Sequence, residues 1–219
     1  MLTYDQVRKS ETIKTYIIRA DESLGALGFT DHSFSHVVHV AQMAGYILQT
    51  MGYDDRTVEV AKIAGYLHDI GNLVNRKDHS QSGAVMAWSI LNDMGCDPAE
   101  IATIVTAIGN HDEGTGVPVN AVAAALILAD KADVRRSRVR NQDIATFDIH
   151  DRVNYSAIQS NLRINEEKTQ IILELTVDTQ YGSVMDYFEI FMQRMILCRK
   201  AAELFALQFK LTINDQELI

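Results

Sequence analysis

The chain has 219 residues, of which 47% are hydrophobic and 22% are charged, enough for one good hydrophobic core. No apolar run is long enough to span a membrane, and the formal net charge of −9 counts against non-specific nucleic-acid binding, which depends on neutralising many phosphates. Cys96 and Cys198 lie in apolar helical patterns and no secretory segment begins the chain, so we expect reduced core thiols in a cytoplasmic protein.

The first part of the chain predicts successive helices joined by short connections. Apolar residues recur at helical spacing near residues 3–27, 34–50, 56–70, 79–94, 98–110 and 120–136. The fifth of these begins clearly, with Asp97 as N-cap, Pro98 at the first position and Glu100 in the first turn. Glycines fall where helices should stop, at positions 28, 52, 71 and 95.

The pattern changes after about residue 155. Residues 161–177 alternate between apolar and polar around an Asn165-Glu166-Glu167 turn, which predicts a β-hairpin. A long helix follows from Ser183 to Leu207, whose Met and aromatic stripe indicates a core or a dimer interface, and "FKLTIN" predicts a last strand. The expected fold class is therefore mainly α, with a helical bundle in 1–150 and a small C-terminal α+β unit in 151–219.

Several of the predicted helices carry a polar group near the end of an apolar face. His68 follows Ala64 by four residues, and Asp130 follows Leu126 by the same spacing. The residues with this placement are His36, His68 with Asp69, His79, His111 and Asp130. A lone histidine of this kind is usually a hydrogen-bonded core residue, but a metal ion would be a common partner for all of them if they converge.

One segment runs against the acidic charge of the chain. Residues 131–140, "KADVRRSRVR", contain five basic residues and one acidic residue. Such a cluster favours a site for a small anion or phosphorylated ligand, and a solvated helix face explains it equally well.

The order of these residues resembles the HD superfamily of metal-dependent phosphohydrolases over about residues 30–140. "SHVVHVAQMAG" is similar to the first ligand helix of that family, "LHDIGN" to its signature doublet and "LILADKAD" to its last ligand helix. "HSQSG" resembles the His-x-x-x-Gly element of two-metal members, and "GNHDEGTGVP" supplies His111. The whole pattern resembles most the branch that includes the YqeK-type dinucleoside tetraphosphate hydrolases.

A weaker similarity links "EGTGVP" to the HD-GYP cyclic dinucleotide phosphodiesterases. Those proteins carry a longer His-His-Glu segment, a Tyr where Val117 stands and a Lys where Asn72 stands. These departures count against cyclic dinucleotide cleavage. The C-terminal unit resembles no family that we can name.

The resemblance implies a centre of two divalent ions. His36, His68, Asp69 and Asp130 would hold one ion, and Asp69 would bridge to a second ion held by His79 and His111. Nitrogen and oxygen ligands without thiolate suit Fe, Mn, Co or Zn better than Mg or Ca, and the family favours Fe or Mn. Two such ions activate water for attack on phosphorus, so Asp69 is expected to be catalytic.

Basic residues after Asp130 are the expected substrate contacts. Lys131 is expected to act catalytically as a point charge on a phosphate oxygen, and helical spacing from it predicts phosphate contacts at Arg135 and Arg138. Asp112 is a candidate proton donor or extra ligand. The remaining polar residues are His32, a candidate substrate or supporting contact; His39, a structural residue; and His150, a loop or packing residue with Arg152 and Asn154 near the edge of the site.

The expected function is hydrolysis of a phosphate ester or anhydride of a nucleotide or other small metabolite through a metal-bound hydroxide. The alternatives are a non-catalytic HD-like module that senses a ligand or dimerises, a purely structural helical protein, and a cyclic dinucleotide phosphodiesterase. Expected partners are the small phosphorylated substrate and a possible second copy in a homodimer, with neither a membrane nor non-specific nucleic acid. The sequence does not identify the substrate or the general acid.

Overall fold

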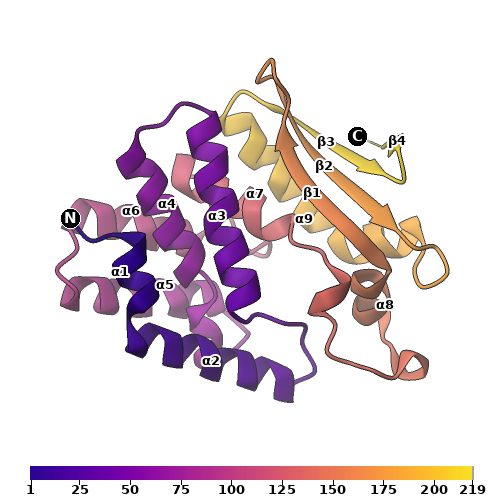
Figure 1. Cartoon of the computed structure of the whole chain (residues 1–219), viewed down its shortest axis with the longest axis horizontal. Helices are drawn as coiled ribbons and strands as arrows, with labels where there is room; N and C mark the ends of the chain where they lie inside the picture. Colours follow the sequence, from indigo (N-terminus) through magenta and orange to yellow (C-terminus); the bar gives the residue numbers. More distant parts are fainter. Residues whose placement is uncertain (219) are drawn as a thin grey trace.

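A helical body lies beside a small sheet in the computed structural model, which describes residues 1–218 (Figure 1). The body contains α1 (Tyr4–Lys9), α2 (Glu11–Ala26), α3 (Phe34–Thr50), α4 (Asp55–Leu67), the 3-10 turn η1 (Ile70–Leu73), α5 (His79–Asp93), α6 (Pro98–Gly109) and α7 (Ala121–Lys131). The C-terminal part contains η2 (Arg136–Arg138), η3 (Ile144–Thr146), α8 (Ile149–Ser156), β1 (Ala157–Ile164), β2 (Gln170–Val177), α9 (Val184–Leu204), β3 (Gln208–Ile213) and β4 (Gln216–Glu217). The predicted fold class, mainly α with a small C-terminal α+β unit, is confirmed.

Local capping explains where the helices begin. The carboxylate of Asp97 accepts hydrogen bonds from the backbone amides of Ala99 and Glu100, as the sequence predicts, and Asp54 caps α4 in the same way. The predicted helix over 3–27 is instead two helices, because Ser10 has an extended backbone and its hydroxyl caps α2.

The helix predicted over 120–136 is too long by five residues. α7 ends at Lys131, and after it Asp133 and Val134 are both buried while Arg135 adopts an extended backbone. Turning here allows Asp133 to point inward toward α3, where its carboxylate meets a histidine. The helical spacing assumed between Lys131, Arg135 and Arg138 therefore does not exist.

α7 is the central helix of the body. Every residue from Val122 to Ala129 is buried, and α7 packs against α3, α4, α6 and α9. Five of its residues are alanines, at positions 121, 123, 124, 125 and 129, and small side chains allow neighbouring helices to approach closely. The C-terminal end of this enclosed helix carries Asp130.

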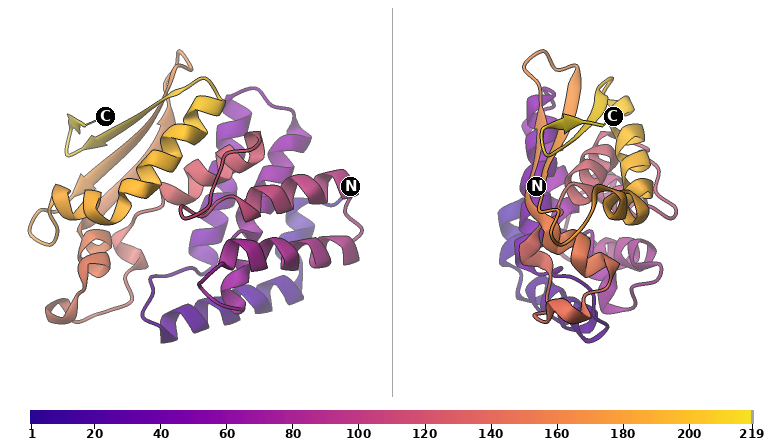
Figure 2. Two further views of the ribbon diagram at one scale, coloured as in Figure 1. Left: turned by 180° about the vertical axis from the view of Figure 1, so that it is seen from behind. Right: turned by 90° about the vertical axis from the view of Figure 1, so that its right-hand side faces the viewer.

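The sheet has the order β1-β2-β3-β4, and the structure adds β4 to the predicted strands. β1 and β2 form the predicted antiparallel hairpin, while β3 returns parallel to β2 after the long helix α9. Alternate residues along β2 and β3 are buried, including Leu173 beside Leu211, because one face of the sheet packs on α9. The view from behind shows α9 lying along that face (Figure 2).

α9 joins the two parts of the molecule. It packs on β3 and on α7, and the buried apolar residues from Leu2 to Ile213 belong to one continuous cluster. The division at residue 150 stays a prediction. Cys96 and Cys198 are buried and unbridged, and none of the helices within residues 1–218 combines the length and hydrophobicity needed to cross a membrane.

Candidate metal centre

The six residues predicted to bind metal converge at one point in the body, and we refer to them as the six ligand candidates. Each lies at or near the end of a helix: His36 in the first turn of α3, His68 and Asp69 directly after α4, His79 at the start of α5, His111 after α6 and Asp130 near the end of α7. His36 and His68 have no exposed surface, and the others are buried or nearly so.

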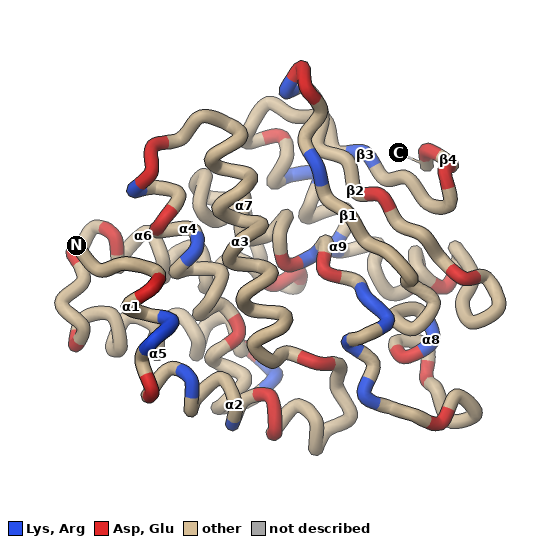
Figure 3. The backbone as a smooth tube through the Cα atoms, viewed as in Figure 1, with Lys and Arg blue, Asp and Glu red and all other residues tan. Residues whose placement is uncertain are grey.

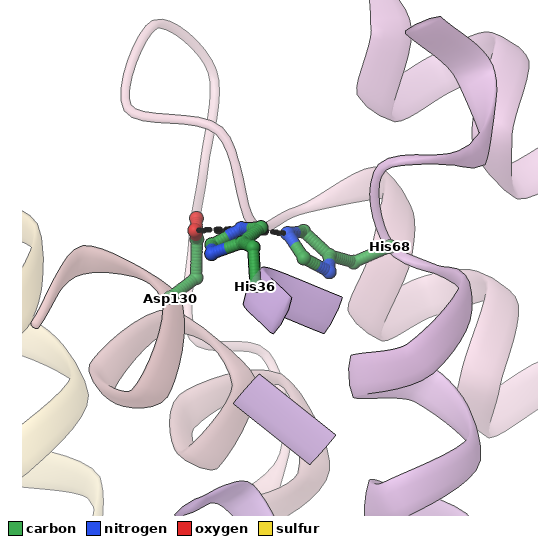
Figure 4. Close-up of side chains that lie close together, drawn as sticks. All are labelled: His36, His68 and Asp130. Atoms are coloured by element: carbon green, nitrogen blue, oxygen red, sulfur yellow. Dashed lines mark hydrogen bonds and ion pairs between the residues drawn. The ribbon is translucent and has the colours of Figure 1, made fainter. Parts of the chain in front are cut away.

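One group of donors surrounds His36. Its Nε2 lies 3.2 Å from Nε2 of His68 and 3.4 Å from Oδ1 of Asp130. Figure 4 shows the two rings and the carboxylate turned toward one another. Donor atoms of these three residues lie within 4.8 Å of one another, close enough to share one ion.

Asp69 faces two groups of donors. Its Oδ2 lies 3.2 Å from Nε2 of His68 and 3.4 Å from Nε2 of His36, whereas its Oδ1 lies 3.4 Å from Nε2 of His79. Nε2 of His79 is in turn 3.2 Å from Nε2 of His111. One oxygen of Asp69 therefore serves each side, the arrangement that a bridging carboxylate requires. Asn72 supports it by donating to Oδ1 at 2.9 Å.

The other ring nitrogen of each histidine is already used. Nδ1 of His36 donates to Asp133 (2.7 Å), and Nδ1 of His68 donates to the Gly65 carbonyl (2.8 Å). In the same way, Nδ1 of His79 donates to the Arg76 carbonyl (3.0 Å), and Nδ1 of His111 donates to the Ile108 carbonyl (2.6 Å). Carbonyl and carboxylate oxygens only accept hydrogen bonds, so Nδ1 carries the proton. Neutral rings then direct the lone pair of Nε2 into the centre, as metal-binding histidines do.

Two lone pairs 3.2 Å apart repel each other unless a cation or proton lies between them. Without metal, a proton can take that place: burial lowers the pKa of His68, but the charge of Asp69 and hydrogen bonds to Asp130 and Asp69 raise it, to about 10. Burial alone would raise the pKa of Asp69, yet His68 and His36 hold it well below its usual range. The donor set therefore fits divalent ions, and both carboxylates are available to bind them.

Asp133 is a functional candidate that sequence reasoning missed. It is buried and accepts a hydrogen bond from Nδ1 of His36. It also accepts hydrogen bonds from Nε and Nη2 of Arg135, at 2.5 and 3.0 Å. These positive partners hold the pKa of its carboxyl below the ordinary value despite burial. Its position three residues after Asp130 was the available signal.

Lys131 lies in the centre but is already paired. Its Nζ is 2.7 Å from Oδ2 of Asp130 and 2.6 Å from Oε2 of Glu113, whose Oε1 receives Nε of Arg194 at 2.9 Å. Burial lowers the pKa of Lys131, but the two carboxylates raise it by more than burial lowers it. The ammonium group therefore stays charged. Arg194 comes from α9, which ties the C-terminal part to the centre.

The basic segment after α7 is mostly committed to internal ion pairs. Figure 3 marks the Lys and Arg positions of the chain in blue and the Asp and Glu positions in red. Arg135, predicted to contact phosphate, instead binds Asp133, and Arg136 donates to the Tyr155 carbonyl and to Asp178. Arg140 pairs with Asp21. Arg138 is buried and does reach the centre, as its lining of the cavities described next shows. The solvated helix face that the sequence also allowed is absent, because these side chains hold the segment to its neighbours.

Three further polar residues lie near the six ligand candidates, two of them beside the centre and one outside it. His32 precedes α3 rather than lying on it, but its Nδ1 donates to the Thr30 carbonyl and its Nε2 lies 4.0 Å from Oδ2 of Asp69. Asp112 Oδ1 is 4.0 Å from Nε2 of His79. His39 is half exposed, 3.9 Å from Asp133, outside the centre.

Two cavities open from this point. The small cavity, about 20 Å³, is lined by Asp69, His79, His111, Asp130, Lys131, His32, Arg76, Arg138 and Arg194. The larger cavity, which we call the chamber, has about 330 Å³ and shares the last four of these residues. His150 and Asn154 line the chamber, whereas Arg152 does not. Arg76 and Arg194 were missed because they lie outside the resemblance motifs, on elements that only the fold brings here.

Comparison with known proteins decides the family. A family model described as HD domain matches residues 33–152, more than half of the chain. The chain belongs to the HD domain family. This confirms the resemblance drawn from the sequence and identifies a metal-dependent phosphohydrolase in general, without naming a substrate. The match also includes His150, which the sequence comparison had left outside.

The similar proteins differ in how much of their length matches this chain. An uncharacterized protein of Methanocaldococcus jannaschii is 24% identical over 205 residues, covering 83% of this chain and 78% of that protein. Ribonuclease Y of Thermosipho melanesiensis is 32% identical over 115 residues, and ribonuclease Y 1 of Pediococcus pentosaceus is 28% identical over 130 residues. This chain spans only 20% and 22% of those two enzymes.

A solved structure of a predicted HD superfamily hydrolase from an uncultured Thermotogales bacterium is also similar. It shares 27% sequence identity, covers 57% of this chain and 67% of that chain, and superposes with a TM-score of 0.45. None of these proteins bears the name of a dinucleoside tetraphosphate hydrolase, so membership of that branch stays a prediction.

Proposed function

We propose that this HD domain protein hydrolyses a small phosphate ester or anhydride, of a nucleotide or similar metabolite, at two divalent ions held by the six ligand candidates. The observation that carries the proposal is the facing of ring nitrogens, His36 toward His68 and His79 toward His111, each pair 3.2 Å apart and beside the carboxylate of Asp69. Four imidazole nitrogens and two carboxylates that face one point suit divalent ions.

The division of ligands follows the geometry. His36, His68 and Asp130 would hold one ion, and His79 with His111 would hold the other, with Asp69 between them. Donor atoms of His68, Asp69 and His111 also lie within 4.8 Å of one another, so the two groups of donors adjoin at His68. Nitrogen and oxygen donors without thiolate fit iron, manganese, zinc or cobalt, and the family resemblance favours iron or manganese. Such ions lower the pKa of a water molecule and neutralise charge on phosphoryl oxygens.

Protein groups beside the centre would bind and orient the phosphate. Arg76, Arg138 and Arg194 line both cavities, and planar guanidinium groups match phosphate oxygens in pairs. These residues replace the earlier assignment to Arg135. Lys131 would stabilise Asp130 and Glu113 more directly than the substrate, because its ammonium already contacts both carboxylates.

His32 and Asp112 are the candidates for proton handling. Burial lowers the pKa of His32 well below its usual range, so its Nε2 is an acceptor beside Asp69. Asp112 is partly exposed near His79, where it can reach a leaving group or serve as an additional ligand. The metal-independent alternative, a ligand-sensing or dimerising module, gives no reason to retain six converging donors.

The first experiment measures metal content and turnover in the same sample. Protein purified without chelator or histidine tag would be analysed for Fe, Mn, Zn and Co, and its hydrolysis of p-nitrophenyl phosphate followed. About two equivalents with turnover support the proposal. About one equivalent removes His79 and His111 from the ligand set, and no metal after reconstitution favours the binding module.

Replacing Asp69 tests the bridge. Asp69→Ala removes both oxygens that face the two groups, so we expect turnover to fall by at least about 10³-fold while the fold survives. Circular dichroism and thermal unfolding of the metal-free proteins would check the fold, and Asp93→Ala on α5 is the matched control. Turnover close to that of the unaltered protein would overturn the two-ion account.

A further inference from the structure

The chamber beside the metal centre has two chemically different ends, and this carries a proposal about the substrate. Resting on the proposed function, we propose that the substrate is a phosphate monoester whose compact organic part carries several hydrogen-bond donors, either hydroxyl or ammonium groups. The phosphate would lie between the centre and the shared arginines, and the donor-bearing part would fill the chamber.

The path from the centre to the chamber is continuous. His32, Arg76, Arg138 and Arg194 line both cavities, so a molecule with its phosphate at the small cavity extends directly into the chamber. The chamber volume of about 330 Å³ is at the lower end of the range for small-molecule sites. The loop after α2, including Phe29, and the α9 residues Ile190 and Phe191 close its sides.

The inner end of the chamber holds guanidinium groups with unused donors. Arg138 is only 6% exposed and uses Nε for the Asp31 carbonyl and Nη1 for the Asp133 carbonyl, and no acceptor in residues 1–218 takes its Nη2. Arg194 uses Nε for Glu113 and has no acceptor in the described chain for either Nη. Guanidinium donors that line a cavity and have no protein acceptor favour binding of an anion.

The outer end of the chamber is lined by acceptors from α8. Asn154 is 7% exposed, and its Nδ2 donates to the His150 carbonyl, which leaves its Oδ1 without a donor among residues 1–218. Asp148 uses one oxygen as N-cap of α8, and Asp151 uses one oxygen for Asn141. The second oxygen of each carboxylate has no protein donor in the described structure.

These acceptors determine what the organic part of the substrate can be. Hydroxyl or ammonium groups would satisfy the free oxygens of Asn154 and Asp151, whereas an alkyl group would leave the oxygen of the buried Asn154 without a partner. A second phosphate would be repelled by the two carboxylates, which disfavours an RNA chain or a dinucleotide. The chain is therefore expected to prefer a monoester over the polynucleotide implied by the name ribonuclease Y.

The test compares small monoesters with and without hydrogen-bond donors. Metal-loaded protein would be assayed with ribose 5-phosphate, O-phosphoethanolamine and butyl phosphate, with p-nitrophenyl phosphate as the general phosphatase substrate and an oligoribonucleotide as the polymer. We expect kcat/KM for a donor-bearing monoester to exceed that for butyl phosphate by about tenfold or more. Ribose 5-phosphate and O-phosphoethanolamine distinguish hydroxyl from ammonium recognition.

A variant links this preference to the chamber. Asn154→Leu keeps the side-chain size and removes the free oxygen, so the preference over butyl phosphate should fall about tenfold, mainly through KM. Asp143→Asn, on an exposed residue outside the chamber, is the control and should leave the preference unchanged. Circular dichroism of both variants checks that they fold.

Failure of the proposal is distinguishable from failure of the enzyme assignment. Equal kcat/KM for butyl phosphate and the donor-bearing monoesters, or faster cleavage of the oligoribonucleotide, overturns the substrate proposal while the phosphohydrolase stands. If even p-nitrophenyl phosphate is not hydrolysed, the proposed function fails, and calorimetric binding of the phosphonate analogues of ribose 5-phosphate and butyl phosphate decides the substrate class. Tighter binding of the ribose analogue supports it, and equal binding overturns it.

Discussion

Asp133 determines the orientation of His36 through a 2.7 Å hydrogen bond from Nδ1. The same carboxylate receives Arg135, and Arg138 lies 3.7 Å from it, so its charge is balanced although it is 1% exposed. A carboxylate behind a metal-binding imidazole makes the ring more basic and fixes its tautomer. Asp133 should therefore affect metal binding without touching the ion.

Asp133→Asn is predicted to weaken metal binding by about 10- to 100-fold, because the amide keeps the size but removes the negative charge behind His36. The measurement is a competitive titration of the metal-free protein with a chelator of known affinity. Glu174→Gln, at an exposed ion pair with Arg163 on the sheet, is the control. Unchanged affinity in Asp133→Asn would show that His36 needs no carboxylate.

His68 makes metal binding dependent on pH. With its pKa raised to about 10 in the metal-free protein, the ring is protonated at neutral pH and must lose that proton to bind an ion. Affinity should rise between about pH 6 and about pH 9, with protons released on binding. Titration calorimetry in two buffers of different ionisation enthalpy counts these protons, and equal heats in both would contradict the expectation.

In the metal-free protein, the raised pKa of His68 also makes the free energy of unfolding depend on pH. A pKa raised above the unfolded value of about 6.5 contributes stability that is fully present below that pH. The contribution is lost as pH rises through about 10. Metal-free protein should therefore lose stability at alkaline pH more steeply than the metal-loaded form, which denaturant titrations at several pH values would measure.

Close backbone approach positions the elements around the centre. A Cβ on Gly71, in η1, would lie 2.0 Å from the carbonyl oxygen of His79 and 2.4 Å from the amide nitrogen of Gly83. Gly71 thus keeps the turn that carries Asp69 in contact with the start of α5, which carries His79. The sequence suggested that Gly71 ends a helix, but its role is this contact, and its φ is not positive.

Gly71→Ala is predicted to destabilise the fold by about 3 kcal/mol or more, since backbone atoms rather than flexible side chains must move. Gly109→Ala is the control, because the nearest atom to its Cβ is 3.7 Å away and alanine suits a helix better. Urea unfolding of the metal-free proteins gives both free energies. Equal stability of the two variants would contradict the close contact.

At the scale of the whole molecule, the C-terminal part completes both the core and the site. The buried face of α9 includes Phe191 and Met195, and the helix packs between α7 and the sheet. Arg194 from the same helix pairs with Glu113 beside the metal centre. The HD match ends at residue 152, before this helix begins.

A fragment of residues 1–156 is therefore predicted not to fold cooperatively, although it contains the whole HD match. Removing α9 exposes the side of α7 that it covers and leaves Glu113 without Arg194. Thermal unfolding followed by near-ultraviolet circular dichroism would test this against the full chain. A sharp transition in the fragment would instead show that the predicted domain of residues 1–150 folds without the C-terminal unit.

Sequence reasoning was sufficient for the regular parts of the molecule. Periodic apolar residues placed the helices around His36, His68, His79 and His111, and alternation placed the hairpin of β1 and β2. These patterns are local, so they can be recognised without knowledge of the fold. The end of α7 was wrong because burial of Asp133 and Val134, a tertiary effect, overrode the helical periodicity beyond Lys131.

The sequence by itself determined the class of fold, the family and the residue types able to hold metal, because hydrophobic period and motif order are written along the chain. Only the tertiary structure decided which cations line the cavities beside the candidate metal centre. It committed Arg135 to Asp133 and brought Arg76 and Arg194 to the cavities, from the loop between η1 and α5 and from α9. The role of a charged side chain depends on the residues that it contacts. A contact between residues as distant in the sequence as Glu113 and Arg194 produces no local sequence pattern from which it could be predicted.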